Sequence, residues 1–255
     1  MNNDNTLNAG ISGIRIITPD ETSSTNNYAT TLLAANEAGE GCVVWTFRQT
    51  QGRGYGKNVW ESEPGMNLTF SLILEPSFLP ASRQFLLSQV VSLGVAGFLR
   101  ELTGDITVKW PNDIYAGNRK IGGILIENTV MGDHLQWSVA GIGLNVNQSS
   151  FPAHLPHAVS LKMLTGTEVD LRESLHSLLG HIFAWYQLLR NRQYRQIREH
   201  YLNAMFGRGR SLTYRSGERV FTAEVEGVDD YGQLLLKEQA GVITTWPFKG
   251  VELLL

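Results

Sequence analysis

A glycine-rich segment with two basic residues, QGRGYGKNVW at 51–60, contains residue types that can bind an anion. Its alternate glycines free backbone N–H groups to point into a concavity, and Arg53 and Lys57 add positive charge. Phosphate-bearing ligands are bound in this way. The segment is not a P-loop, because that motif's first glycine and its Ser or Thr are both missing. Taken alone, it is also typical of a flexible polar surface loop.

A second candidate is VKWPNDIYAGNRKIGGILIE at 108–127. Its PND turn follows a strand, AGN reverses the chain, and Lys120 begins the next strand eleven positions after Lys109. The two amines can therefore face one pocket from neighbouring strands. Gly122 and Gly123 inside the second strand favour close approach by a ligand. The alternative is an ordinary hairpin with two surface lysines and an Asx turn.

A third candidate, AGIGLNVN at 140–147, ends a predicted strand. It lacks the last glycine of a dinucleotide-binding fingerprint, and no helix pattern follows it, which excludes a Rossmann site. Asn145 remains as a side chain that can both donate to and accept from a nucleobase edge. A β-bulge would explain the glycines equally well.

Strands and helices must hold these three segments in place. Short runs rich in β-branched and aromatic residues predict strands at 14–18, 42–47, 67–74, 106–110, 121–130 and 135–146. Helical spacing predicts helices at 24–36 and 82–102, and a long helix after the capping box formed by Asp170 and Glu173.

The pattern of apolar and turn residues changes after Phe206. Five short apolar runs alternate with turn residues there, without any helical pattern, which predicts a small β-barrel. We therefore expect a main domain over 1–206 and a small barrel domain over 207–255.

Composition limits the class of protein. The 255 residues carry a net charge of -3 and 42% hydrophobic residues, as a globular protein does, so any polyanion binding must be local. The single cysteine excludes an internal disulfide and a multi-cysteine metal site, and no histidine spacing identifies metal ligands. Because the sequence has no secretory leader and no run of eighteen apolar residues, we expect a cytoplasmic protein without a membrane span.

Five blocks of the sequence, taken in order, closely resemble the biotin protein ligases. They are STN at 24–26, QTQGRGYGKNVW at 49–60, GMNLTFSLIL at 65–74, KWPNDIYAGNRKIGGILIE at 109–127 and GIGLNVN at 141–147. The resemblance implies an α+β fold, in which a mixed sheet flanked by helices, like that of class II aminoacyl-tRNA synthetases, is followed by an SH3-like barrel. About twenty residues precede STN, too few for the helix-turn-helix domain of relatives with repressor activity, so the enzyme-only form is expected.

The resemblance also implies an activity with two steps. Biotin and ATP, with Mg²⁺ expected, would give biotinyl-5′-adenylate and pyrophosphate, and a lysine of a biotin carboxyl carrier domain would then accept the biotin. Neither DNA nor a membrane is implied as a partner, and a homodimer is left open. Two other readings remain. Lipoate ligases share the fold but usually carry an RRxxGGG element that is missing here, and a catalytically silent biotin or nucleotide sensor is the other.

Site residues follow from matching the family motifs. The catalytic residues implied are Lys120, Arg53 and Asp113, with Lys120 bridging the biotin carboxylate and the α-phosphate. The biotin-binding residues implied are Ser24, Thr25, Asn26, Gln49, Gly52, Arg53, Lys120, Gly122, Gly123, Leu125 and Gly141. The ATP-binding residues implied are Arg53, Gly54, Tyr55, Lys57, Trp60, Lys109, Asn112, Lys120 and Asn145, with Trp60 covering the adenine and Asn145 reading its edge.

The glycine-rich segment is expected to stay mobile until ligand arrives and then to close over it. Two departures from the family pattern affect this site. Tyr55 stands where many relatives have a second arginine, which predicts altered retention of the adenylate. The sequence also stops at Leu255, where some relatives continue with a basic residue near the ATP phosphates, which argues against a phosphate contact from the C-terminal strands.

Overall fold

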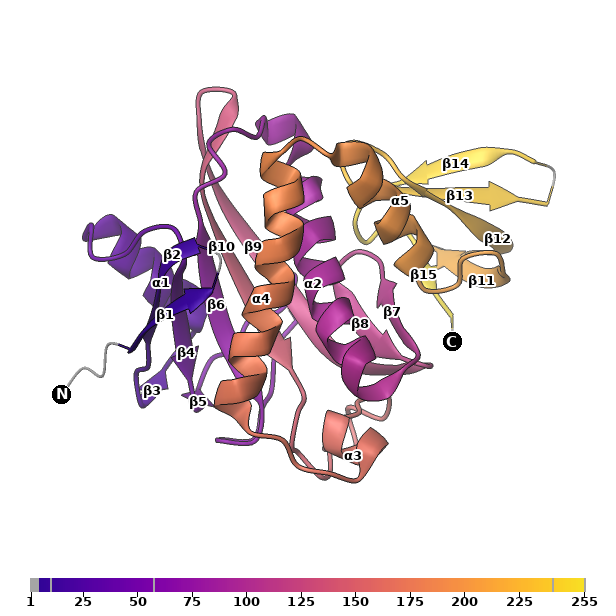
Figure 1. Ribbon diagram of the computed structural model, residues 1–255. Helices are drawn as coiled ribbons and strands as arrows, with labels where there is room; N and C mark the ends of the chain where they lie inside the picture. The colour runs from indigo at the N-terminus through magenta and orange to yellow at the C-terminus, as the bar shows by residue number, and fades with distance from the viewer. Residues whose placement is uncertain (1–4, 10, 57, 240, 255) are drawn as a thin grey trace.

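The computed structural model describes residues 5–9, 11–56, 58–239 and 241–254. Its centre is a mixed eight-stranded sheet in the order β1-β2-β4-β6-β10-β9-β8-β7 (Figure 1). Only β2 and β4 pair in parallel, and all other neighbours are antiparallel. In chain order these strands are β1 (Asn5–Ala9), β2 (Ile11–Ile17), β4 (Cys42–Thr46), β6 (Leu68–Leu74), β7 (Ile106–Lys109), β8 (Asp113–Ala116), β9 (Arg119–Met131) and β10 (His134–Leu144). Two short strands, β3 (Glu21–Thr22) and β5 (Arg48–Gln49), form a parallel pair beside it.

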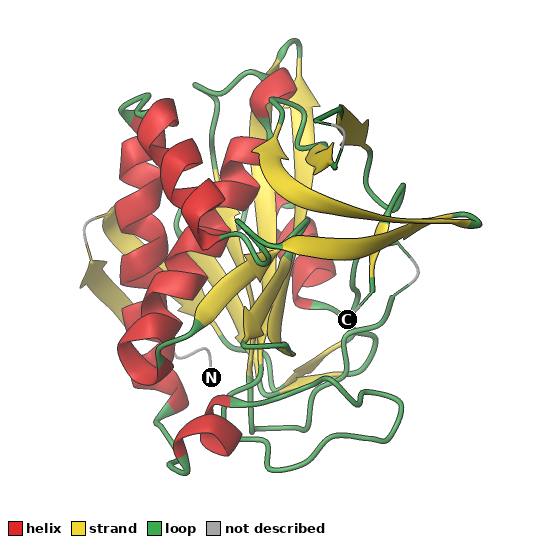
Figure 2. Ribbon diagram, turned by 90° about the vertical axis from the view of Figure 1, so that its right-hand side faces the viewer, coloured by secondary structure: helices red, strands yellow, loops and turns green. Residues whose placement is uncertain are grey.

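Helices cover both faces of the sheet. Helices α2 (Phe85–Thr103) and α4 (Leu171–Arg190) lie side by side on one face, as Figures 1 and 2 show, and α1 (Thr25–Ala34) packs on the other. The remaining helices are η1 (Ala81–Arg83), α3 (Leu161–Thr165) and α5 (Tyr194–Ala204).

The alternation of side chains along the strands separates two cores. In β6, Phe70 and Leu72 belong to the large core beneath α2 and α4, whereas Ile73 belongs to a small core beneath α1. Because successive residues of a strand point to opposite faces, a strand buried on both faces reads as a continuous apolar run. The predicted N-cap of α4 is also confirmed, since the Asp170 side chain accepts a hydrogen bond from the Glu173 N–H at 2.8 Å.

The six predicted strands and three predicted helices are present, which confirms a mixed sheet flanked by helices. Helices α3 and α5 and strand β8 were not predicted. Strand β8 has only four residues between two turns, so its apolar pattern is too short to stand out. It lies between β7 and β9, and the expectation that Lys109 and Lys120 come from neighbouring strands is therefore wrong. One strand separates them.

The C-terminal strands form a second, antiparallel sheet in the order β14-β13-β12-β11-β15. They are β11 (Ser211–Ser216), β12 (Arg219–Val228), β13 (Leu234–Glu238), β14 (Ile243–Trp246) and β15 (Glu252–Leu253). Among the described residues β14 and β15 do not pair, so this sheet is open and an SH3-like barrel stays a prediction.

The second sheet shares its core with the first. Tyr214 and Leu234 belong to the same buried cluster as Val108 of β7, and the Trp110 indole N–H donates to the Gly232 carbonyl at 2.8 Å. The C-terminal strands therefore pack against the main sheet through a shared buried cluster, and the division into two domains at residue 206 stays a prediction.

Helix α2 accounts for the one membrane-like segment among the described residues. The segment Ala81–Thr103 is long and apolar enough to cross a membrane by length and composition, with a mean hydropathy of 1.4. However, 72% of its apolar 18-residue stretch is buried inside the protein. That is the position of a core helix, because a helix that is apolar all round needs partners on all sides.

Candidate functional site

A cavity of about 400 Å³ opens on the sheet face that α1 covers, beside α1. Its floor is made by mostly small residues on three adjacent strands. Gly143 of β10 lies opposite Thr69 of β6 and Gly123 of β9, and Gly141 lies opposite Leu125 of β9. Because alternate residues of a strand share a face, the small residues Thr69, Gly143 and Gly123 lie on the same face as Gly141, and together they leave a hollow in the sheet.

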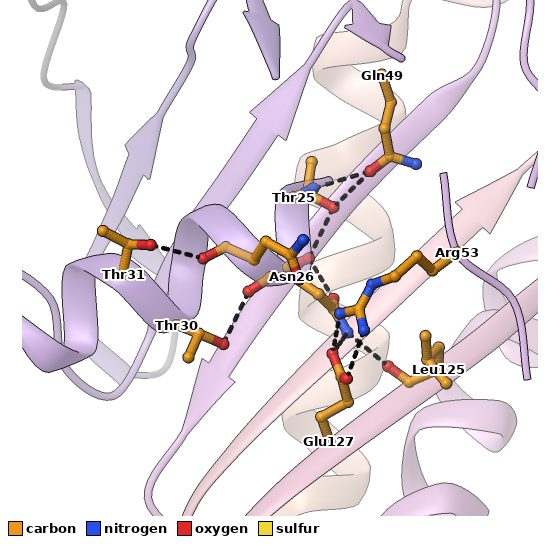
Figure 3. Close-up of polar contacts among 10 residues, drawn as sticks. Thr25, Asn26, Thr30, Thr31, Gln49, Arg53, Leu125 and Glu127 are labelled. Atoms are coloured by element: carbon orange, nitrogen blue, oxygen red, sulfur yellow. Dashed lines mark hydrogen bonds and ion pairs between the residues drawn. The ribbon is translucent and has the colours of Figure 1, made fainter. Parts of the chain in front are cut away.

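The N-terminus of α1 forms one polar wall of the cavity. The Thr25 N–H donates to Gln49 Oε1 at 2.8 Å (Figure 3). Ser71 Oγ of β6 donates to Asn26 Oδ1 at 2.6 Å. Asn26 is almost fully buried, so these contacts fix its orientation. Gly141 is required for this arrangement, because a β-carbon there would lie 2.3 Å from Asn26 Oδ1.

Glu127 connects this wall to the glycine-rich segment, and it was not among the predicted site residues. Its carboxylate accepts two hydrogen bonds from the Arg53 guanidinium, at 2.9 and 2.5 Å, and a third from Asn26 Nδ2 at 2.7 Å (Figure 3). The bidentate geometry orients Arg53 as well as neutralising it. The sequence did carry a signal, since Gly123, Leu125 and Glu127 share one face of a strand.

Lys120 forms a second ion pair in the cavity. Its Nζ lies 2.6 Å from Asp113 Oδ1, with side-chain exposures of 36% and 26%. The backbone of Lys120 is fixed on its other side, where its N–H donates to the His157 carbonyl at 2.7 Å and its carbonyl accepts from the Val159 N–H at 2.9 Å. A cation held by its backbone and oriented by a carboxylate can face a ligand without moving far.

Lys109 brings a third cation into the cavity with a different environment. Its Nζ lies 3.3 Å from the Tyr115 hydroxyl and 5.0 Å from the centre of that ring. Burial lowers the pKa of Lys109, opposed by the charge of Asp113. Burial likewise raises the pKa of Tyr115 to about 12. An anion in the cavity would favour the charged form of Lys109, because an opposite charge offsets the cost of desolvation.

The glycine-rich segment forms a tight hairpin over the cavity. The Trp60 N–H donates to the Gly52 carbonyl at 3.0 Å, and the Gly54 N–H donates to the Asn58 carbonyl at 2.8 Å. The Trp60 ring covers the floor, since a β-carbon at Gly143 would lie 2.2 Å from Trp60 Cε2. The described residues of the segment, 52–56 and 58–60, are therefore held by backbone hydrogen bonds of their own.

Most of the predicted site residues line this one cavity. They are Ser24, Thr25, Asn26, Gln49, Arg53, Gly54, Tyr55, Trp60, Lys109, Asn112, Asp113, Lys120, Gly123, Leu125 and Gly141. Lys57 lies outside the described residues.

Three predicted residues do not line the cavity. Gly122 faces the opposite side of β9, where a β-carbon would lie 3.2 Å from Leu144 Cδ1. Gly52 is needed at the base of the hairpin, because a β-carbon there would lie 2.2 Å from the Trp60 carbonyl oxygen. Asn145 is buried, and its side-chain amide donates to the Val159 carbonyl at 3.1 Å, whereas its Oδ1 has no hydrogen-bond partner among the described residues. The assignment of these three residues to biotin or ATP stays a prediction.

Comparison with known proteins gives one consistent family. The sequence model of the Biotin/lipoate A/B protein ligase family matches residues 19–145. A bifunctional ligase/repressor BirA of Bacillus spizizenii is 32% identical over 240 residues, covering 92% of this chain and 73% of the relative. A biotin–[acetyl-CoA-carboxylase] ligase of Paracoccus denitrificans is 28% identical over 206 residues, covering 78% of this chain and 85% of the relative.

The fold agrees with the sequence relatives. A solved structure of the biotin protein ligase from Aquifex aeolicus in complex with biotin and ATP superposes with a TM-score of 0.77 and 27% identity, covering 94% of this chain and 98% of that one. Sequence, fold and a cation-rich cavity over a glycine floor lead to the same conclusion: this chain belongs to the biotin protein ligase family.

Proposed function

We propose that this chain is an ATP-dependent biotin–[biotin carboxyl carrier protein] ligase that carries out both steps in the cavity of about 400 Å³. In the first step an oxygen of the biotin carboxylate attacks the α-phosphorus of ATP, the bond to the β-phosphate oxygen breaks, and pyrophosphate leaves. In the second step the amine of a carrier lysine attacks the acyl carbon of biotinyl-5′-adenylate, AMP leaves, and the amine gives up a proton. One observation carries the proposal, namely the meeting of Arg53, Lys109 and Lys120 at a single cavity.

The chemistry of the first step explains why cations are needed. A carboxylate must approach a phosphate, and the two anions repel each other unless fixed positive charges offset their repulsion. We assign Lys120 to the point where the two ligands meet, because its Nζ is held at the rim of the glycine floor. A floor without side chains at Gly123 and Gly143 supports this assignment, since it leaves room for both ligands above the sheet.

The rest of the cavity divides between the two ligands. We assign the uncharged end of biotin to the polar wall of Thr25 and Asn26, whose amide and hydroxyl groups suit a neutral polar ring. Trp60 is assigned to the nucleotide, with its ring as a stacking surface for adenine. Asp113 orients Lys120 in the first step and is placed to accept the proton of the incoming amine in the second.

Mg²⁺ is proposed to enter with the nucleotide as MgATP. Within the described residues, no group of three or more His, Cys, Asp or Glu side chains is arranged to hold a metal ion. A magnesium ion bound through phosphates and a few carboxylates would agree with that, because Mg²⁺ usually keeps several waters and takes few protein ligands.

We propose a biotin carboxyl carrier domain of a biotin-dependent carboxylase as the protein partner, because the Paracoccus denitrificans relative is a biotin–[acetyl-CoA-carboxylase] ligase. The cytoplasm is the proposed location, and an SH3-like architecture is proposed for the C-terminal sheet. A homodimeric state remains a proposal as well, and so does the absence of a DNA partner.

Incubation with biotin and α-labelled ATP, with and without a carrier domain, tests the function. The expected result is biotin-dependent release of pyrophosphate with labelled adenylate when carrier is omitted, and amide-linked biotin on the carrier when it is added. Lipoate in place of biotin should give neither product. Adenylate formation with lipoate alone would favour the lipoate ligases, and ligand binding without pyrophosphate release would favour a silent sensor.

A further inference from the structure

The cations of the cavity differ in how far they are already neutralised. Arg53 is paired with Glu127, and Lys120 is paired with Asp113. Lys249, in the turn between β14 and β15, also lines the cavity, and among the described residues its ammonium contacts the Tyr55 ring and forms no ion pair with a carboxylate. A polyphosphate carries several negative charges. An ammonium that is not paired with a carboxylate attracts it more strongly than Arg53 and Lys120 do, because the carboxylates of Glu127 and Asp113 partly cancel the charge of those two groups.

Lys249 is directed at the glycine-rich hairpin. Its Nζ lies 5.3 Å from the centre of the Tyr55 ring, within the range of a cation–π interaction. The ammonium also lies against Gly56, because a β-carbon at Gly56 would be 2.2 Å from Lys249 Nζ. The hairpin thus makes room for the Lys249 ammonium at two consecutive residues: Tyr55 offers the face of its ring, and Gly56 has no side chain.

The backbone of this turn is unusual as well. Lys249 has a φ of 63°, in the left-handed region that residues other than glycine, asparagine and aspartate seldom adopt. The turn is closed by the Gly250 N–H, which donates to the Pro247 carbonyl at 2.9 Å. Non-glycine residues persist in this conformation when surrounding contacts hold them, and such residues gather at ligand-binding and closing segments.

A row of aromatic rings connects the turn to the body of the protein. Phe248 meets the Tyr55 ring edge-on at 5.7 Å, and on its other side its ring centre lies 5.4 Å from Trp110 and 6.1 Å from Phe85. Trp110 belongs to the KWPND turn, next to Lys109. The hairpin, the C-terminal sheet and the cation cluster are therefore held together through Phe248.

We propose that Lys249 is an anion-binding residue of this site, contacting the terminal phosphates of ATP or the pyrophosphate product, and that its contact with Tyr55 holds the ammonium at the rim of the cavity. This inference rests on the proposed function, because it names a further contact for the same nucleotide. It also gives Tyr55 a role of its own, because the Tyr55 ring makes the cation–π contact with the Lys249 ammonium. It differs from the expectation that the C-terminal strands make no phosphate contact, and the experiments below decide between the two.

Lys249→Met is the central variant, because methionine keeps an unbranched side chain at the same backbone conformation and removes only the charge. Lys237→Met is the matched control, since Lys237 is an exposed lysine of the same C-terminal sheet outside the cavity. Lys249→Arg restores the positive charge. In biotin-dependent ATP–pyrophosphate exchange, we expect Lys249→Met to raise KM for ATP about 10-fold or more, as loss of one charge-assisted contact does, with little change in KM for biotin. Lys249→Arg should recover most of the loss.

A direct titration separates failure of this inference from failure of the proposed function. Binding of ATP and of inorganic pyrophosphate to the intact protein is followed calorimetrically, with no need for turnover. Weaker binding of both by Lys249→Met, with Lys237→Met binding like the wild type, supports the inference even if exchange is absent. Equal binding by the Lys249→Met and Lys237→Met proteins overturns it, and so does a loss that affects biotin as much as ATP.

Discussion

Replacement of Lys120 by methionine removes the cation at the centre of the cavity and keeps most of the side chain's volume. Its cost to stability is small, because the pair with Asp113 is partly exposed, at 36% and 26%, and such pairs contribute roughly 0.2–1 kcal/mol. In a chain of this size a change of about 1 kcal/mol shifts Tm by roughly 2–4 °C. The backbone contacts of Lys120 to His157 and Val159 are untouched by the substitution.

The expected cost to catalysis is much larger. A preorganised donor at a developing negative charge is worth about 100- to 1000-fold in rate, or roughly 2.7–4 kcal/mol. Lys120→Met should therefore slow adenylate formation by at least about 100-fold while Tm falls by no more than a few degrees. The separation of these two effects distinguishes loss of a reacting group from loss of the fold.

Single-turnover formation of labelled adenylate from biotin and ATP measures the rate, and thermal unfolding measures the stability. Lys162→Met is a matched control, because Lys162 forms an ion pair of 2.7 Å with Glu168 at 31% side-chain exposure and does not line the cavity. Adenylate formation by Lys120→Met at the rate of the Lys162→Met protein would refute the role assigned to Lys120. A collapse of Tm without a separate loss of rate would refute the argument that the pair is structurally minor.

Three further predictions test the floor, a helix and an acid-sensitive contact. Gly143→Ala places a β-carbon 2.2 Å from Trp60 Cε2, so Trp60 must move, and we expect KM for ATP to rise by about 10- to 100-fold in the exchange assay. Gly180→Ala in the exposed face of α4 meets no atom within 4 Å and should raise the free energy of unfolding by about 0.5–1 kcal/mol in urea titrations; no gain there would contradict the helix geometry. Burial lowers the pKa of His176 below its usual 6.5. As the pH falls through this range, the unfolded chain takes up more protons than the folded protein, so the free energy of unfolding falls. His176→Gln should therefore lessen the loss of stability between about pH 7.5 and about pH 5.5, and an unchanged loss would argue against this role of His176.

The sequence predicted the elements whose patterns are local. The strands that form the floor appear as apolar runs with small residues at alternate positions, and the long helix α4 begins at the predicted N-cap, Asp170, whose side chain accepts a hydrogen bond from the Glu173 N–H. Strand β8 was missed because four residues between turns carry too little pattern. The family motifs then brought most of the candidate residues to one cavity, because they lie at strand ends and turns that meet there.

The structure adds facts that adjacency in sequence does not contain. Gly122 and Gly123 are neighbours, yet only one of two successive strand residues can face a cavity, and the register of β9 selects Gly123. The same alternation puts Glu127 beside Arg53, a pairing that becomes visible only when the hairpin lies over the sheet. The sequence gave no signal that Lys249 belongs to the site, because most of the chain separates Lys249 from Tyr55, the residue it contacts.

The most direct test of this account is a crystal structure with biotin and a non-hydrolysable ATP analogue bound together. We expect the biotin carboxylate and the α-phosphate to lie above Gly123 and Gly143, each within hydrogen-bond distance of Lys120 Nζ. A complex in which both ligands are bound while the Lys120 amine contacts neither of them would contradict the account.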